Sequence, residues 1–238
     1  LVEKHGASRI AAVIVEPFCG SAGVIVPPRG YLQRLRAICD KYDILLIFDE
    51  VITGFGRAGG AFGADVFGVV PDLMCLAKGL TNGSVPMGAV VASANIYQAF
   101  MDTDAPEYLV EFPHGYTYSG HPVACAAGLA AMEIFEREKL EDRVRDLAPH
   151  FEDALHGLRG VRHITDIRNF GLAGALQIDP APGEPARRPF EIAMACWEKG
   201  LYVRWAGDTV AMGPPFICEK HQIDEACNIL SDCIAKVT

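Results

Sequence analysis

Two short apolar runs, with an amphipathic segment between them, constrain the fold of this chain more than any other feature. Residues 10–15 end at Glu16, and residues 44–48 end at Asp49. Apolar runs of this length are typical of strands that are buried on both faces of a sheet. Between them, residues 31–42 repeat apolar side chains at helical spacing. Strand, helix and strand in this order predict a βαβ crossover and therefore a parallel sheet.

The strand series continues and then gives way to segments of a different character. Residues 73–76 and 85–92 are predicted strands, and residues 119–138 a long Ala-rich helix. The later segments are predicted helices at 139–157, 189–199 and 219–236, an extended stretch at 163–179, and short strands at 202–205 and 209–212. The sequence thus predicts an α/β fold: part of a mainly parallel-sheet large domain over residues 1–145, and a smaller C-terminal α+β domain over residues 146–238.

The composition is that of a packed globular protein. Half of the 238 residues are hydrophobic and 21% are charged, which excludes low-hydrophobicity disorder. The net charge of −9 and the lack of a Lys/Arg cluster argue against a nucleic-acid partner. No apolar run approaches the length of a membrane span, so no membrane partner is expected.

The eight cysteines and the first residues bear on metal binding and location. No pair of cysteines has CxxC spacing, and no His/Cys pattern has the spacing of a zinc site, so no metal is expected. Cysteines in apolar surroundings fit a reducing compartment. The first residues, 1–5, lack the apolar core of a signal peptide. We therefore expect a cytoplasmic protein.

An acid and a lysine stand where two predicted strands end. Asp49 follows the run 44–48, and Lys78 follows the run 73–76. Ligands of open parallel sheets bind beyond the carboxyl ends of the strands. Pyridoxal phosphate needs a lysine amine for its Schiff base and a carboxylate against its ring nitrogen. Lys78 follows apolar residues, so this interpretation predicts an amine removed from water. The alternative is a capping acid and an unrelated surface lysine, and the two residues alone do not exclude it.

Four motifs surround this pair in a fixed order. They are EPFCGSAG at 16–23, LIFDEVITGFGR at 46–57, AKG at 77–79 and GYTYSGHP at 115–122. Together they resemble the signature of the class III pyridoxal-phosphate-dependent aminotransferases, which have fold type I. The resemblance covers essentially the whole chain. It begins partway into the large domain of the family, so we expect this chain to correspond to the C-terminal half of a family subunit.

The resemblance implies a role for each matching position. Lys78 would form the Schiff base with pyridoxal 5'-phosphate, and Asp49 would be the partner of the ring nitrogen. Val51 and Ile52 would lie on the face of the cofactor. Thr117 would bind the phosphate of the neighbouring subunit's cofactor, which implies a homodimer or higher homo-oligomer with shared active sites. Without the resemblance, core packing for Val51 and a satisfied turn hydroxyl for Thr117 are the alternatives.

Arg204 and Glu16 complete the set of candidate site residues. Arg204 follows strand-like residues and is suited to hold a carboxylate bidentately. The segment 200–209 resembles the omega-amino acid:pyruvate (beta-alanine–pyruvate) branch of the family, whose matching arginine binds the substrate carboxylate. A surface ion pair is the alternative for Arg204. Glu16 either orients groups on the cofactor side or caps the turn that follows it.

The resemblance predicts the reaction as well as the site. It implies pyridoxal-phosphate-dependent transamination of an omega-amino acid or amine, of the beta-alanine type, with pyruvate as acceptor and alanine as product. Other class III enzymes remain as alternatives: diamine, 4-aminobutyrate or taurine aminotransferases, or an aminomutase. A non-catalytic fragment that serves as an oligomerisation module is an alternative from another class. The expected partners are a small-molecule amino donor and a keto acid.

Overall fold

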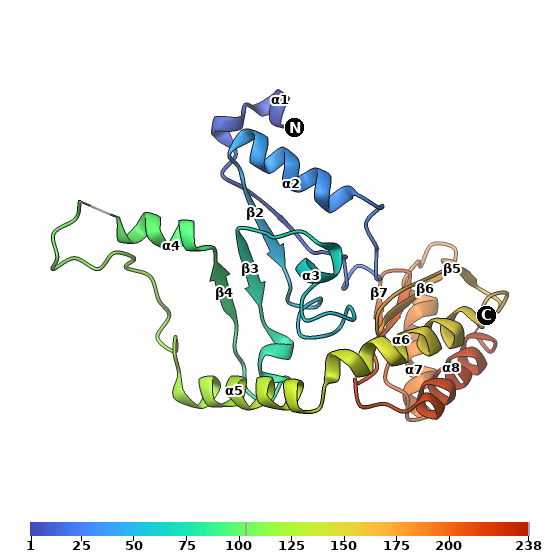
Figure 1. The fold of residues 1–238 in the computed structure, drawn as a ribbon. Helices are drawn as coiled ribbons and strands as arrows, with labels where there is room; N and C mark the ends of the chain where they lie inside the picture. Colours follow the sequence, from blue (N-terminus) through green and yellow to red (C-terminus); the bar gives the residue numbers. More distant parts are fainter. Residues whose placement is uncertain (103, 238) are drawn as a thin grey trace.

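The computed structural model describes residues 1–102 and 104–237, which contain two four-stranded sheets (Figure 1). The strands of the first sheet are β1 (Ala12–Val15), β2 (Leu45–Asp49), β3 (Leu73–Leu76) and β4 (Ala89–Ala92), in that order. The pairs β1–β2 and β2–β3 are parallel, whereas β4 runs antiparallel to β3. The predicted α/β fold with a mainly parallel sheet is confirmed.

The strand predicted at 85–92 begins only at Ala89. Pro86 has no N–H to give to a sheet ladder, so it disfavours a strand at this point. The hydroxyl of Thr81 also donates to the carbonyl of Val85 at 2.6 Å, which occupies that acceptor locally. Residues 85–88 therefore form an irregular connection.

Helix α2 (Tyr31–Tyr42) packs on one face of the first sheet and has the predicted bounds. Leu46 and Phe48 of β2 point to that side and are fully buried. The prediction that β1 is buried on both faces is wrong, because Ile14 is 61% exposed. Successive side chains of a strand point to opposite faces of the sheet. Helix α2 covers one face, so the side chains on the other face are buried only where another element packs on them.

The second sheet is antiparallel and carries a closed core. Its strands are β5 (Ile164–Phe170), β6 (Ala173–Ile178), β8 (Thr209–Met212) and β7 (Arg204–Ala206), in that spatial order. The helices that pack with it are α6 (Leu140–His156), α7 (Arg187–Glu198) and α8 (Lys220–Ile234). Phe151, Leu176, Ile192 and Leu230 are fully buried between these elements.

The remaining elements connect the two sheets or extend from them. They are α1 (Val2–His5), the 3₁₀ helices η1 (Ala7–Arg9) and η2 (Lys78–Thr81), α3 (Gly63–Phe67), α4 (Ala94–Met101) and α5 (Pro122–Arg137). Figure 1 shows α5 and α6 following one another along one side of the molecule, from the first sheet to the second. The predicted domain division after residue 145 falls inside α6 and stays a prediction. Within the described residues, no helix is both long enough and apolar enough to cross a membrane.

Candidate active site

Asp49 and Lys78 lie at the same edge of the first sheet. Asp49 is the last residue of β2, and its register partner on β3 is Cys75. Lys78 begins η2 directly after the end of β3. Because β2 and β3 are parallel, both residues stand beyond the carboxyl ends of neighbouring strands, where open α/β sheets bind their ligands.

The Asp49 carboxylate is held by the loop that follows β2. The backbone N–H of Val51 donates to Asp49 Oδ1 at 3.1 Å, and the Asp49 side chain is half-buried. This hydrogen bond restricts the rotation of the carboxylate. It also keeps the backbone of Val51 close to the carboxylate.

Lys78 has an unusual backbone conformation. Its φ of 43° lies in the left-handed region, which residues other than glycine seldom adopt and which is often found at functional sites. The next residue, Gly79, packs closely on Phe55, because a Cβ at Gly79 would lie 2.6 Å from Phe55 Cβ. The expectation that the Lys78 amine is removed from water is wrong for this chain. Lys78 is exposed because it comes after the apolar strand residues rather than among them.

Glu16 caps the turn that follows β1. Its Oε2 atom accepts a hydrogen bond from the backbone N–H of Gly20 at 2.9 Å. Gly20 in turn lies against Ile52, since a Cβ at Gly20 would be 2.7 Å from Ile52 Cγ2. The loops after β1 and β2 are therefore in contact at this edge of the sheet. A role for Glu16 toward a cofactor stays a prediction.

Glu50 is a buried acid that the sequence reasoning missed. It is fully buried and accepts hydrogen bonds from the Thr53 hydroxyl and from the backbone N–H groups of Gly63 (2.8 Å) and Ala64 (2.7 Å). Thr53 and Gly63 flank the loop that leaves the end of β2, so one carboxylate holds that loop at both ends. The signal in the sequence was a second acid at the end of an apolar strand, followed by a threonine three residues later.

Arg57, the last residue of the motif at 46–57, joins the two parts of the chain. Its Nη1 atom donates to the carbonyl oxygens of Leu172 (2.9 Å) and Pro214 (2.8 Å). The guanidinium lies over the Phe216 ring, 4.6 Å from the ring centroid. Burial lowers the pKa of Arg57 to about 10. Its partners are backbone carbonyls of the second sheet's connecting segments.

The other two predicted site residues, Arg204 and Thr117, lie outside the first sheet. Arg204 is the first residue of β7 in the second sheet, and it is exposed. Thr117 belongs to residues 104–123, all of which are exposed. Figure 1 shows the green segment before α5 running away from the first sheet. The structure thus brings Asp49, Lys78 and the Val51–Ile52 loop together, and it places Thr117 on an outlying segment.

The acid and the amine suit one cofactor in particular. A carboxylate can accept the ring N–H of pyridoxal phosphate, and a primary amine can react with its aldehyde. Both groups lie at the ends of neighbouring parallel strands, and Gly79 next to Lys78 packs closely on Phe55. Among the described residues there is no group of three His, Cys, Asp or Glu side chains that could hold a metal ion.

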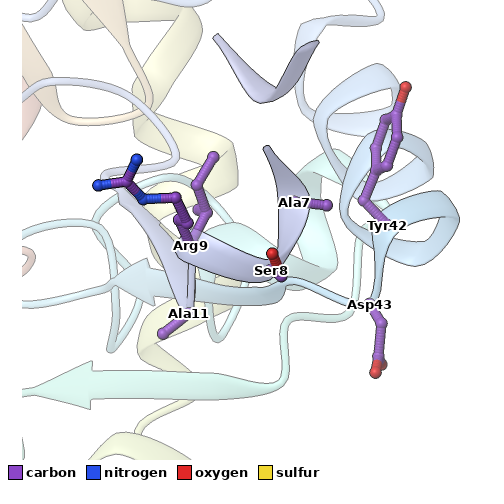
Figure 2. A pocket seen from close by; sticks show the side chains of 7 residues that line it. Ala7, Ser8, Arg9, Ala11, Tyr42 and Asp43 are labelled. Carbon is purple, nitrogen blue, oxygen red and sulfur yellow. The ribbon is translucent and has the colours of Figure 1, made fainter. Parts of the chain in front are cut away.

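A pocket of about 370 Å³ lies at the opposite edge of the first sheet. It is lined by Ser8 and Arg9, which precede β1, and by Tyr42 and Asp43, which precede β2. Figure 2 shows the side chains of Arg9, Tyr42 and Asp43 pointing in different directions instead of toward one centre. Because the lining residues stand at the amino ends of the strands, this pocket is separate from the candidate active site.

Comparisons with known proteins agree with this geometry. The model of the aminotransferase class-III family matches residues 1–234. An omega-amino acid–pyruvate aminotransferase of Pseudomonas putida is 59% identical over 237 residues, which is all of this chain and 53% of that protein. A beta-alanine–pyruvate aminotransferase of Pseudomonas aeruginosa is 59% identical over 234 residues, which is 98% of this chain and 52% of that protein.

A solved structure shares the fold. An amine transaminase from an uncultivated Pseudomonas species, in its PLP-bound form, superimposes with a TM-score of 0.92 at 37% identity, covering 100% of this chain and 55% of that one. The chain therefore spans about half the length of these relatives. Class III aminotransferases use pyridoxal 5'-phosphate. By the match to the family over residues 1–234, the chain belongs to the class III aminotransferases.

Proposed function

We propose that the full-length protein containing this chain is a pyridoxal-phosphate-dependent aminotransferase. It would transfer the amino group of an omega-amino acid or amine, of the beta-alanine type, to pyruvate and so form alanine. The observation that carries the proposal is the placement of Asp49 and Lys78 beyond the ends of neighbouring parallel strands. The names of the two relatives at 59% identity support the choice of amino donor and acceptor.

Each residue of this edge has a defined task in such a reaction. Pyridoxal phosphate, when bound, supplies an electron sink for the carbon that loses its proton. The Asp49 carboxylate would accept the ring N–H, in the orientation that the Val51 N–H fixes. Lys78 Nζ would take the proton from the donor carbon and return it to the cofactor carbon. Val51 and Ile52 would present apolar surface to the ring.

Arg204 is proposed to hold the carboxylate of the substrate. A guanidinium binds a carboxylate with two parallel hydrogen bonds, and both pyruvate and beta-alanine carry a carboxylate. Arg204 is exposed at the start of β7, and among the described residues no acid forms an ion pair with it. Its guanidinium is therefore available to a ligand.

The remaining proposals concern partners and location. The exposed segment 104–123 carries Thr117, whose hydroxyl is suited to bind the phosphate of a neighbouring subunit's cofactor. This would make the active unit a homodimer or a higher homo-oligomer. A cytoplasmic location fits the eight free cysteines, four of which are buried.

Replacing Lys78 tests the proposed function directly. In the full-length protein, Lys78→Ala should lower the rate of alanine formation from beta-alanine and pyruvate by roughly a thousandfold, because the group that moves the proton is lost. Borohydride reduction should also no longer attach the cofactor covalently to the protein, because the amine that would react with its aldehyde is absent. The matched control is Lys139→Ala, because Lys139 is another exposed lysine with a positive φ of 49° but lies at the start of α6. Full turnover by Lys78→Ala would contradict the proposal.

The choice of acceptor separates this proposal from other reactions of the same family. With beta-alanine as donor, the wild-type protein should form alanine from pyruvate faster than it forms glutamate from 2-oxoglutarate. A clear preference for 2-oxoglutarate would keep the aminotransferase and reject the pyruvate branch. The Lys78 variant serves as the blank in both assays.

A further inference from the structure

Arg57 connects the loop that leaves the active-site edge to the second sheet. Its own loop begins at the end of β2, where Asp49 lies, and is fixed at both ends by Glu50. Its side chain crosses to the carbonyls of Leu172 and Pro214. The proposed mechanism assigns no role to this arginine.

The two carbonyls that Arg57 binds lie at the edge of the second sheet where Arg204 begins its strand. Leu172 directly precedes β6, and Pro214 comes shortly after the end of β8. The register pairs Ala175 of β6 with Ala211 of β8, and Ala211 with Arg204. Because neighbouring strands are antiparallel, the start of β6, the end of β8 and the start of β7 lie side by side at the same end of the sheet, which we call its edge.

At this edge the backbone at Arg57 packs closely against the backbone of residues 171–172. The backbone N–H of Leu172 donates to the carbonyl of Arg57 at 3.1 Å, so Arg57 is bound through both its backbone and its side chain. Gly171 has a φ of 54°, and a Cβ at this position would lie only 2.4 Å from the Arg57 carbonyl oxygen. A glycine is required there both by its backbone angle and by the lack of space.

The chemistry of this contact favours an arginine over any other side chain. One guanidinium nitrogen, Nη1, donates to both carbonyls, while the face of the planar group rests on the Phe216 ring. Among the described residues no carboxylate forms an ion pair with Arg57. A largely buried charge without a counter-charge is unfavourable unless hydrogen bonds compensate it, and the carbonyls of Leu172 and Pro214 supply such hydrogen bonds.

We propose that Arg57 is a positioning residue: it fixes the edge of the second sheet that carries Arg204 relative to the end of β2 that carries Asp49. Arg57 thereby determines how well Arg204 meets the carboxylate of the substrate, without touching the substrate itself. This inference rests on the proposed function, because it presumes that Arg204 binds that carboxylate.

The test compares an acceptor that has a carboxylate with one that has none. In the full-length protein, Arg57→Met and Arg57→Lys are assayed with 1-phenylethylamine as donor and either pyruvate or benzaldehyde as acceptor. The KM for pyruvate should rise roughly tenfold in Arg57→Met, the scale of one charge-assisted hydrogen bond, and less in Arg57→Lys. The kcat/KM for benzaldehyde should change by less than about twofold, since that acceptor makes no use of Arg204.

Arg143 offers a matched control. It lies on α6 and donates to the carbonyls of Phe216, Ile217 and Cys218, so it binds the same segment through the same kind of acceptor. The partners of its side chain among the described residues all belong to the segment 216–219, and none to the Arg57 loop. Arg143→Met should lower stability and leave the KM for pyruvate within about twofold of wild type.

Hydrogen exchange gives a second readout that does not depend on activity. The amides of residues 211–213, at the edge that Arg57 holds, should exchange faster in Arg57→Met than in wild type or Arg143→Met. If Arg57→Met does not fold, Arg57→Lys carries the same comparison of acceptors. An equal loss with both acceptors, or an unchanged KM for pyruvate, overturns the role of Arg57. A wild-type protein that transfers no amino group to pyruvate overturns the proposed function instead.

Discussion

The two sheets of this chain are covered to different extents. In the second sheet, three helices enclose a core in which Phe151, Leu176 and Leu230 are fully buried. Around the first sheet, Ile14 on β1 is 61% exposed and Val90 on β4 is 64% exposed. The residues proposed for proton transfer lie in this less covered part. The closed core therefore lies in one part of the chain, and the residues proposed for proton transfer lie in the other.

The largest expected effect is the difference in the free energy of unfolding between a core substitution and a substitution on the exposed strand β4. Phe151→Ala should lower the free energy of unfolding by about 3–5 kcal/mol, because Phe151 is fully buried and packs closely on Gly174. Val91→Ala on β4, where the side chain is 46% exposed, should lower it by less than about 1 kcal/mol. Urea unfolding of the full-length protein measures both. Similar losses for the two variants would show that other parts of that protein cover β4.

Glu50, directly after β2, is fully buried although it belongs to the less covered part of the chain. Glu50→Ala leaves the hydroxyl of Thr53 and the N–H groups of Gly63 and Ala64 without their acceptor. We expect a loss of about 3 kcal/mol in the free energy of unfolding, because buried donors to a charged acceptor become unsatisfied. Glu50→Gln keeps one acceptor oxygen and should lose less.

The surface control for this substitution is Glu133→Ala on α5. Glu133 is exposed, so its removal should change stability by no more than about 0.5 kcal/mol. Differential scanning calorimetry of the three variants and the wild type gives the order of their stabilities. A loss for Glu50→Ala as small as that for Glu133→Ala would mean that the loop after β2 does not depend on this carboxylate.

The sequence pattern was sufficient to predict helices and strands whose structure is determined by residues close in sequence. Residues 31–42 form a helix with the predicted bounds, because left-handed residues at Gly30 and Asp43 end an amphipathic stretch on both sides. The strands that end at Asp49 and Leu76 also follow from short apolar runs. The family resemblance then assigned chemistry to Asp49 and Lys78, which no periodicity could do.

Contacts between distant residues account for what the sequence did not reveal. Arg57 binds Leu172 and Pro214, which are far away along the chain, and no local pattern marks such a pair. The exposure of Ile14 depends on which elements cover the second face of β1, and that is not encoded in the strand itself. Helix α4 was missed although Ser93 is a suitable N-cap residue, because its eight residues are too few to show a clear period.

The smallest expected effect concerns a surface acid of the second part. Asp179 Oδ2 lies 3.1 Å from Nδ1 of His163, whose side chain is 5% exposed, and Asp179 Oδ1 accepts from Arg188 at 2.9 Å. The hydrogen bond with His163, and then the charge of Arg188, hold the pKa of Asp179 below its ordinary value. A carboxyl whose pKa is lower in the folded state stabilises that state above the unfolded pKa, about 3.9, and this contribution is lost as the pH falls through the folded pKa.

Asp179→Asn should therefore lower the Tm at pH 7 by a small amount, and the difference from wild type should shrink as the pH falls below about 3.9. Asp232→Asn is the control, because Asp232 is an exposed acid that pairs only with the Lys199 amine at 3.2 Å among the described residues. Its effect at pH 7 should be smaller still, since an exposed pair of flexible side chains contributes little. Thermal unfolding at pH 7 and pH 3 checks both. A difference for Asp179→Asn that is the same at both pH values would show that the charge of this carboxylate does not stabilise the folded state.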